Sequence, residues 1–183
     1  MSFDDISNPD AGGTINVVFD STKVAGGLGN NKPNMFDNMT VTKDGKIILQ
    51  EDVGNAEHVG KVWEYDINTK SMRVLGEFDR TLFGDLKADG SFVAGLYTKD
   101  EESSGVFDVT DILGKNDGAK YYLLTSQIHA SAASLGLTNP TALVEGGQLN
   151  MMRVAAVPEP ETYAMFLAGL GMLGTIARRR KAK

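Results

Sequence analysis

The stretch of residues 36–78 constrains the fold most, because a hairpin turn divides it into strands of defined order. Asp44 and Gly45 form the Asp-Gly pair that hairpin turns favour, and they separate predicted strands at 39–42 and 47–50. A polar loop follows, and alternating residues predict further strands at 61–67 and 72–78. Four consecutive strands predict an antiparallel meander with the length and order of one β-propeller blade. The pattern also fits a small isolated sheet or part of a sandwich.

The rest of the chain up to residue 157 predicts a second, less regular set of strands. The alternation and turn signals place these elements at 13–21, 91–97, 105–108, 121–128 and 148–154, with a helical turn at 111–113. The chain has 21 glycines in 183 residues, which suits short strands and turns better than a helical bundle. Two blades cannot close a ring, since a propeller needs at least about four. We therefore expect an all-β domain over residues 1–157, made of antiparallel four-stranded blades of an incomplete β-propeller.

The charge of the predicted domain excludes some partners. Residues 158–183 hold 2 of the 24 acidic and 5 of the 18 basic side chains, so residues 1–157 hold 22 and 13, a net charge of −9. Such an acidic surface disfavours nucleic acid. It is compatible with divalent cations, which take oxygen ligands. The absence of cysteine removes disulfides and thiolate metal ligands.

The C-terminal segment, residues 158–183, has three parts in fixed order. A triplet of Pro158, Glu159 and Pro160 precedes an uncharged apolar run at 163–177. The chain then ends in a basic cluster that begins Arg178, Arg179, Arg180. The run predicts one transmembrane helix of about 22 Å, at 1.5 Å rise per residue, with the arginines on the cytoplasmic side. An ordinary C-terminal tail anchor and a buried amphipathic helix are the alternatives.

This order resembles the PEP-CTERM sorting signal of Gram-negative bacteria. The resemblance implies recognition by an exosortase, a membrane transpeptidase that cuts near the triplet. It also implies a transient stay at the inner membrane, followed by the periplasm, the outer surface or the extracellular matrix. The first residues, MSFDDISNPDAGG, contain neither the basic nor the apolar region of a signal peptide. We therefore expect the chain to be the C-terminal part of a longer exported protein.

Acidic residues flank the predicted hairpin and form the candidate metal site. Asp37 precedes its first strand, and Glu51 and Asp52 follow its second. A hairpin brings its ends together, so we expect Asp37 and Glu51 to lie close to each other. Neighbouring carboxylates repel unless they share a proton or bind a cation, and oxygen donors are the ligands of Ca²⁺. A solvated loop rim is the alternative.

Six short motifs between residues 34 and 154 resemble the C-terminal part of the PhoX-type alkaline phosphatase family. They are DN at 37–38, DGKIILQED at 44–52, KVWEYDINT at 61–69, ESSG at 102–105, LLTSQIHA at 123–130 and LVEGGQLNMMRV at 143–154. The resemblance implies a β-propeller with a calcium and iron cluster that hydrolyses phosphomonoesters. It implicates Glu51 and Glu102 as metal ligands, then Asp37 and Asp52, with His129 and Glu145 lining the site. Without the resemblance, Glu102 is an exposed acid and His129 a packed histidine at a strand end.

Two functions follow as expectations. The first is the C-terminal portion of a metal-dependent phosphatase, acting on a phosphorylated small molecule only when the protein is complete. Iron would require the complete protein, because this chain has no cysteine. The second is a non-enzymatic, calcium-stabilised propeller scaffold at the cell surface.

Overall fold

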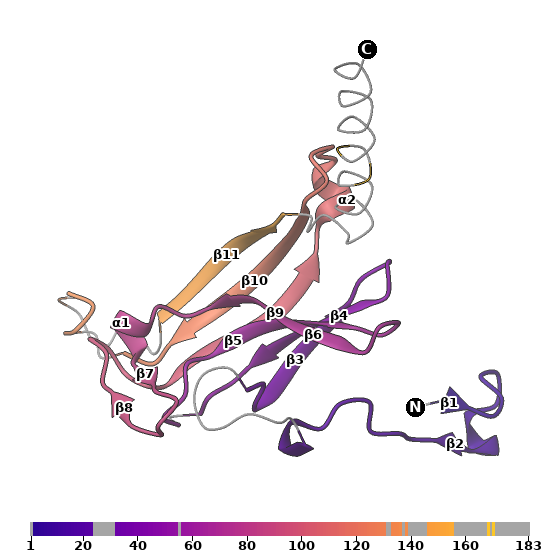
Figure 1. The fold of residues 1–183 in the computed structure, drawn as a ribbon, viewed down its shortest axis with the longest axis horizontal. Coiled ribbons are helices and arrows are strands. Elements are labelled where there is room, and N and C mark those ends of the chain that lie inside the picture. Colours follow the sequence, from indigo (N-terminus) through magenta and orange to yellow (C-terminus); the bar gives the residue numbers. More distant parts are fainter. Residues whose placement is uncertain are drawn as a thin grey trace, which may run out of the picture.

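The structure is a computed structural model that describes residues 2–23, 32–54, 56–130, 133–136, 138, 146–155, 168 and 170. Within these residues the fold is mostly antiparallel β-sheet with a few short helices (Figure 1). Two larger sheets carry the candidate site. Short elements precede the first sheet in the sequence, and others lie between the first and second sheets along the chain.

The first sheet is the predicted meander. It contains β3 (Phe36–Val41), β4 (Lys46–Glu51), β5 (Lys61–Asp66) and β6 (Ser71–Glu77), all antiparallel and in the order β3-β4-β5-β6. Gly45 lies at φ +77°, a conformation that glycine adopts without strain, and the Thr42 amide donates to the Lys46 carbonyl at 2.8 Å. The Asp-Gly hairpin prediction is therefore confirmed.

The second sheet has three strands in the order β11-β10-β9, again antiparallel. These are β9 (Glu101–Asp108), β10 (Lys120–Ile128) and β11 (Gly146–Val154), with the short helix α2 (Thr110–Leu113) between the first two. The strands expected at 121–128 and 148–154 and the helical turn at 111–113 are confirmed. The strand expected at 105–108 is the second half of β9. Its first half escaped prediction because residues 101–104 are all polar.

Two other strand predictions were wrong over most of their length. In the segment 13–21, only β2 (Gly13–Thr14) is a strand, and it pairs with β1 (Ser2–Phe3). Ile15 and Val17 are 77% and 79% exposed, so their alternation meets no neighbouring strand. In the segment 91–97, only β8 (Phe92–Val93) is a strand, paired with β7 (Asp85–Leu86). The remaining short helices are α1 (Arg80–Phe83) and two 3₁₀ turns at Pro9–Ala11 and Ser21–Lys23.

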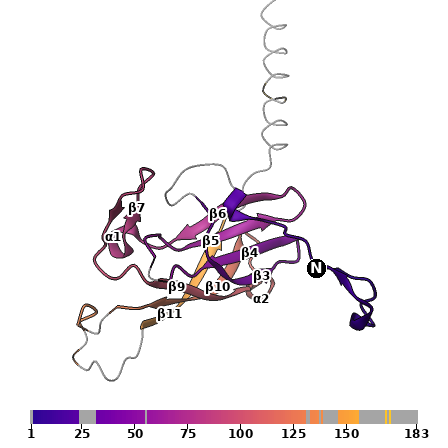
Figure 2. The same cartoon turned by 90° about the horizontal axis from the view of Figure 1, so that it is seen from below.

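The two larger sheets pack against each other through an apolar core, and they lie as two layers in Figure 2. Ile48 and Val62 of the first sheet belong to one cluster with Val106, Tyr122 and Leu124 of the second. All five are buried. Burying a side chain of this kind contributes about 1.5–3 kcal/mol, so this cluster is a main source of stability.

Aromatic side chains lie on the opposite face of the first sheet. The Phe19 ring lies 5.9 Å from the Phe36 ring and 6.3 Å from the Tyr65 ring, between centroids. Phe19 belongs to the N-terminal segment that was expected to be a strand. This segment therefore covers the first sheet through side-chain packing instead of strand pairing.

The fold class is confirmed as all-β with antiparallel sheets. Its further description as part of a β-propeller stays a prediction, as does the domain boundary between 157 and 158. None of the helices in the described residues is long and apolar enough to cross a membrane. The transmembrane helix predicted at 163–177 lies outside the described residues, apart from 168 and 170.

Candidate metal centre

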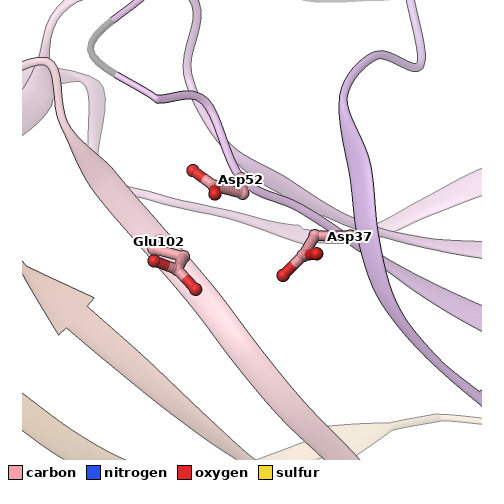
Figure 3. A group of neighbouring side chains, drawn as sticks. All are labelled: Asp37, Asp52 and Glu102. Carbon is pink, nitrogen blue, oxygen red and sulfur yellow. The ribbon is translucent and has the colours of Figure 1, made fainter.

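Three carboxylates from distant parts of the chain converge at one point. Asp37 lies on β3, Asp52 directly follows β4, and Glu102 lies on β9. Each side chain offers an oxygen atom, and these three oxygens all lie within 4.8 Å of one another (Figure 3). Asp37 is exposed, and the other two are half-buried.

A β-bulge directs Asp37 toward this point. Phe36 pairs with Glu51 and Asn38 with Gln50, so Asp37 is an extra residue between two consecutive pairs. A bulge of this kind changes the direction of a side chain without ending the strand. The Asn38 side-chain amide donates to Asp37 Oδ2 at 2.5 Å and to Ser104 Oγ at 3.3 Å. The same amide therefore links β3 to β9.

A backbone bridge between the two sheets brings Asp52 and Glu102 together. These residues form an isolated antiparallel β-bridge. Residues opposite each other in such a pair have Cβ atoms about 4.5–5.5 Å apart, so two carboxyl groups can meet. The Asp52 amide donates to the Met35 carbonyl at 3.0 Å, and Asp52 Oδ1 accepts from the Gly54 amide at 2.9 Å. These contacts fix the backbone on both sides of Asp52.

The chemistry of the three side chains fits a hard cation. Three carboxylates offer up to six oxygens, and Ca²⁺ takes six to eight at about 2.3–2.6 Å. Oxygens within 4.8 Å of one another can share one ion after the side chains close in by a few tenths of an ångström. Without a cation, three negative charges this close disfavour one another.

The structure places Glu51 apart from these three residues. Its side chain is fully buried and lies among hydrogen-bond donors of its own. Oε1 accepts from the Trp63 indole and from the Asn34 amide, each at 2.8 Å, and Oε2 lies 2.9 Å from His58 Nε2. Glu51 therefore joins the loop after β4 to the first sheet, and a role as a metal ligand stays a prediction. Sequence reasoning gave His58 no role, yet it is part of this contact.

Of the other predicted residues, His129 is the one that the structure describes. Its Nδ1 lies 3.0 Å from Asp100 Oδ2, so it is a paired histidine at the end of β10. Glu145 lies outside the described residues, as do the predicted sorting residues Pro158, Glu159, Pro160, Arg178, Arg179 and Arg180.

Sequence reasoning missed Glu101, the neighbour of Glu102. Glu101 is fully buried, its Oε1 accepts from the Gly60 amide at 3.0 Å, and its Oε2 has no hydrogen-bond partner within the described part of the chain. Burial raises the pKa of Glu101 to about 7. The adjacent pair Glu101 and Glu102 is the sequence signal for a buried acid. Neighbouring residues of a strand face opposite sides of the sheet, so one of the two must face inward.

Lys61 is a second buried ionisable side chain, and it lies near Glu101. It is 2% exposed, and its ammonium group donates to the Val59 carbonyl at 3.0 Å. Burial lowers the pKa of Lys61. The beginning of β5 and the beginning of β9 therefore each bury an ionisable side chain.

The comparisons with known proteins concern the C-terminal segment. The PEP-CTERM protein-sorting motif matches residues 156–181. No curated protein and no solved structure matches the chain. The motif implies export across the cell envelope of a Gram-negative bacterium and recognition by an exosortase. The resemblance of residues 34–154 to PhoX-type phosphatases finds no support in these comparisons.

Glu101 makes the stability of the domain depend on pH. Its pKa of about 7 in the folded state lies above the value of about 4.5 expected when unfolded. A proton therefore binds more tightly to the folded state, and this stabilisation is present below pH 4.5 and lost as the pH rises to about 7. One proton corresponds to a slope of at most about 1.4 kcal/mol per pH unit.

We expect Glu101→Gln to remove this slope between pH 4.5 and 7. The pKa values of Asp66 and Asp117 are lowered to about 2, so these groups act on stability below this window. Urea unfolding of both proteins across the window measures the difference. A parallel pH dependence in the two proteins would refute the assignment to Glu101.

Proposed function

We propose that this chain is the exosortase-sorted part of an exported surface protein, and that its β-sheet domain is a calcium-stabilised scaffold. The sorting motif at 156–181 is the observation that carries the proposal. The convergence of Asp37, Asp52 and Glu102 supports the calcium part.

Calcium would stabilise the scaffold because its ligands come from both sheets. Asp37 and Asp52 belong to the first sheet and its continuation, and Glu102 belongs to β9 of the second. An ion held by all three joins the sheets at the place where their backbones already touch. Binding to the folded state alone contributes about 2.7 kcal/mol at a free calcium concentration 100 times Kd.

We expect calcium to raise the melting temperature of the chain. For a protein of this size about 1 kcal/mol corresponds to about 2–4 °C, so near-saturating calcium should raise the midpoint by about 5–10 °C. Asp52→Asn and Glu102→Gln should each abolish most of the shift, because each removes a ligand charge. Asp10→Asn, at an exposed acid of the N-terminal 3₁₀ turn, is the matched control and should keep it.

Thermal unfolding with calcium and with EDTA measures the effect. An unchanged midpoint in the wild-type chain would show that calcium has no structural role. An equal shift in the wild type and in both ligand variants would place the ion elsewhere.

Metal-dependent phosphatase activity is a second candidate function. The observation that favours it is that Asp37, Asp52 and Glu102 converge although they lie in three separate motifs of the PhoX-like pattern. When bound, a metal centre would neutralise phosphate oxygens and stabilise the charge on the leaving oxygen. Since the chain lacks cysteine, any thiolate ligand of iron would have to come from a longer protein.

The phosphatase candidate predicts activity only in a version extended upstream with further blades. Such a protein should hydrolyse p-nitrophenyl phosphate, lose this activity with EDTA, and lose it again in Glu102→Gln. The present chain should show none, because it supplies part of a site. If the longer protein shows no chelator-sensitive turnover, the phosphatase candidate is rejected and the calcium-stabilised scaffold remains as the proposed function.

The sorting proposal predicts that cleavage of the chain depends on the Pro-Glu-Pro triplet. With an export signal placed before Met1, a cell that contains exosortase should cut the chain near Pro158 and release it from the inner membrane. Replacing Pro158, Glu159 and Pro160 by alanine should leave the full-length chain in the membrane fraction. Thr162→Ala is the control and should be processed normally.

Fractionation and intact mass of the product measure this outcome. Equal processing of the triplet variant would refute recognition through this motif. Equal processing in cells without exosortase would assign the cut to another protease.

A further inference from the structure

A cavity of about 470 Å³ lies between the two larger sheets, beside α1. Its walls come from β5 and β6 on one side, β9, β10 and β11 on the other, and α1 with the segment that follows it. This volume lies in the range of small-molecule sites, about 300–1,000 Å³. The carboxylates Asp37, Asp52 and Glu102 do not line it, so it is separate from the candidate metal centre.

One part of the cavity wall is polar and uncharged. Ser103 lines the cavity with 1% of its surface exposed, and its hydroxyl has no hydrogen-bond partner within the described part of the chain. Beside it on β10, the Ser126 hydroxyl accepts from the Asn150 amide at 2.9 Å. A buried polar group without a partner destabilises the fold, and a ligand oxygen that hydrogen-bonds to it would remove that penalty.

Another part of the wall is apolar and aromatic. The Phe83 ring packs edge-on against Phe78, with centroids 5.3 Å apart, and lies 6.0 Å from the Tyr97 ring. Ile128 and Met152 also line the cavity. Such a wall favours an alkyl chain or a ring over a fully hydrated ligand.

The charged side chains that line the cavity are engaged in contacts of their own. Glu77 pairs with Arg80 at 2.8 Å, Asp79 accepts from the Thr81 amide at 2.8 Å, and Lys61 donates to the Val59 carbonyl. Two acidic side chains and one basic side chain line the cavity among the described residues, so an anionic ligand would meet a net negative wall. This disfavours an anionic ligand.

We propose that this cavity binds a small uncharged amphiphile, with an apolar body and a hydroxyl or carbonyl oxygen. The oxygen hydrogen-bonds to Ser103, and the apolar body lies against Phe83 and Tyr97. The site acts independently of calcium and of the sorting motif.

Photolabelling of the full-length chain in mild detergent tests this proposal. The probe is a C8 alkanol that carries a diazirine, and mass spectrometry maps the labelled residues. We expect labels in peptides that contain Phe83 and Met152, displaced by excess 1-octanol. The carboxylate analogue of the probe, charged at pH 8, should label these peptides at least tenfold less.

Two glycines offer a matched pair of variants. A Cβ added at Gly76, which lines the cavity, would meet Met152 Sδ at an ordinary 3.6 Å. Gly76→Val should therefore fold, fill part of the cavity and reduce labelling at least tenfold. At Gly147 of β11, which does not line this cavity, an added Cβ meets nothing within 4 Å, so Gly147→Val should label like the wild type.

Ser103→Ala tests the polar contact separately. It should weaken labelling by the alkanol several-fold and leave labelling by the matching diazirine alkane unchanged. Labelling confined to residues 163–177, equal labelling by the carboxylate, or equal labelling of both glycine variants would overturn the proposal.

Discussion

Ile48 and Val62 of one sheet pack against Val106, Tyr122 and Leu124 of the other, and this apolar contact fixes where the other features lie. It holds β9 beside the first sheet, so Glu102 meets Asp52 through a backbone bridge. It also leaves the cavity beside α1, where serine and asparagine side chains take the place of apolar ones. The candidate metal centre and the cavity are thus two consequences of one sheet-to-sheet contact.

Two buried glutamates near this contact, Glu51 and Glu101, differ in their hydrogen-bond partners. Glu51 has three neighbouring hydrogen-bonding groups, from Trp63, Asn34 and His58. Among the described residues, the equally buried Glu101 has a donor from Gly60 at Oε1 and none at Oε2, and burial raises its pKa to about 7. A buried carboxyl with too few donors is stable in its neutral form. The two acids are therefore alike in burial and differ in the number of hydrogen-bonding groups that surround them.

The sequence predicted those elements whose signals are local. Asp44 and Gly45 marked the hairpin, and alternation along 61–67 and 121–128 marked β5 and β10. The first half of β9 shows no alternation of apolar and polar residues, because Glu102 and Ser104 face β3 and the loop after β4 while the buried face carries Glu101 and Ser103. At the site, hairpin geometry pointed to Asp37 and Glu51. The bulge at Asp37 has no glycine to announce it, and the Asp52–Glu102 bridge joins residues far apart in sequence.

The sorting motif and the acidic domain make physical sense together in an exported protein. Sites built from a few partly exposed carboxylates bind calcium weakly, like extracellular modules with Kd values of about 10⁻⁴–10⁻³ M. A scaffold of this kind would remain unloaded where calcium is scarce and gain its ion after export. The repulsion among Asp37, Asp52 and Glu102 would then be replaced by shared coordination between the sheets. Under the proposed function, export would coincide with stabilisation, because the acids that repel one another in the free domain would hold it together around a cation.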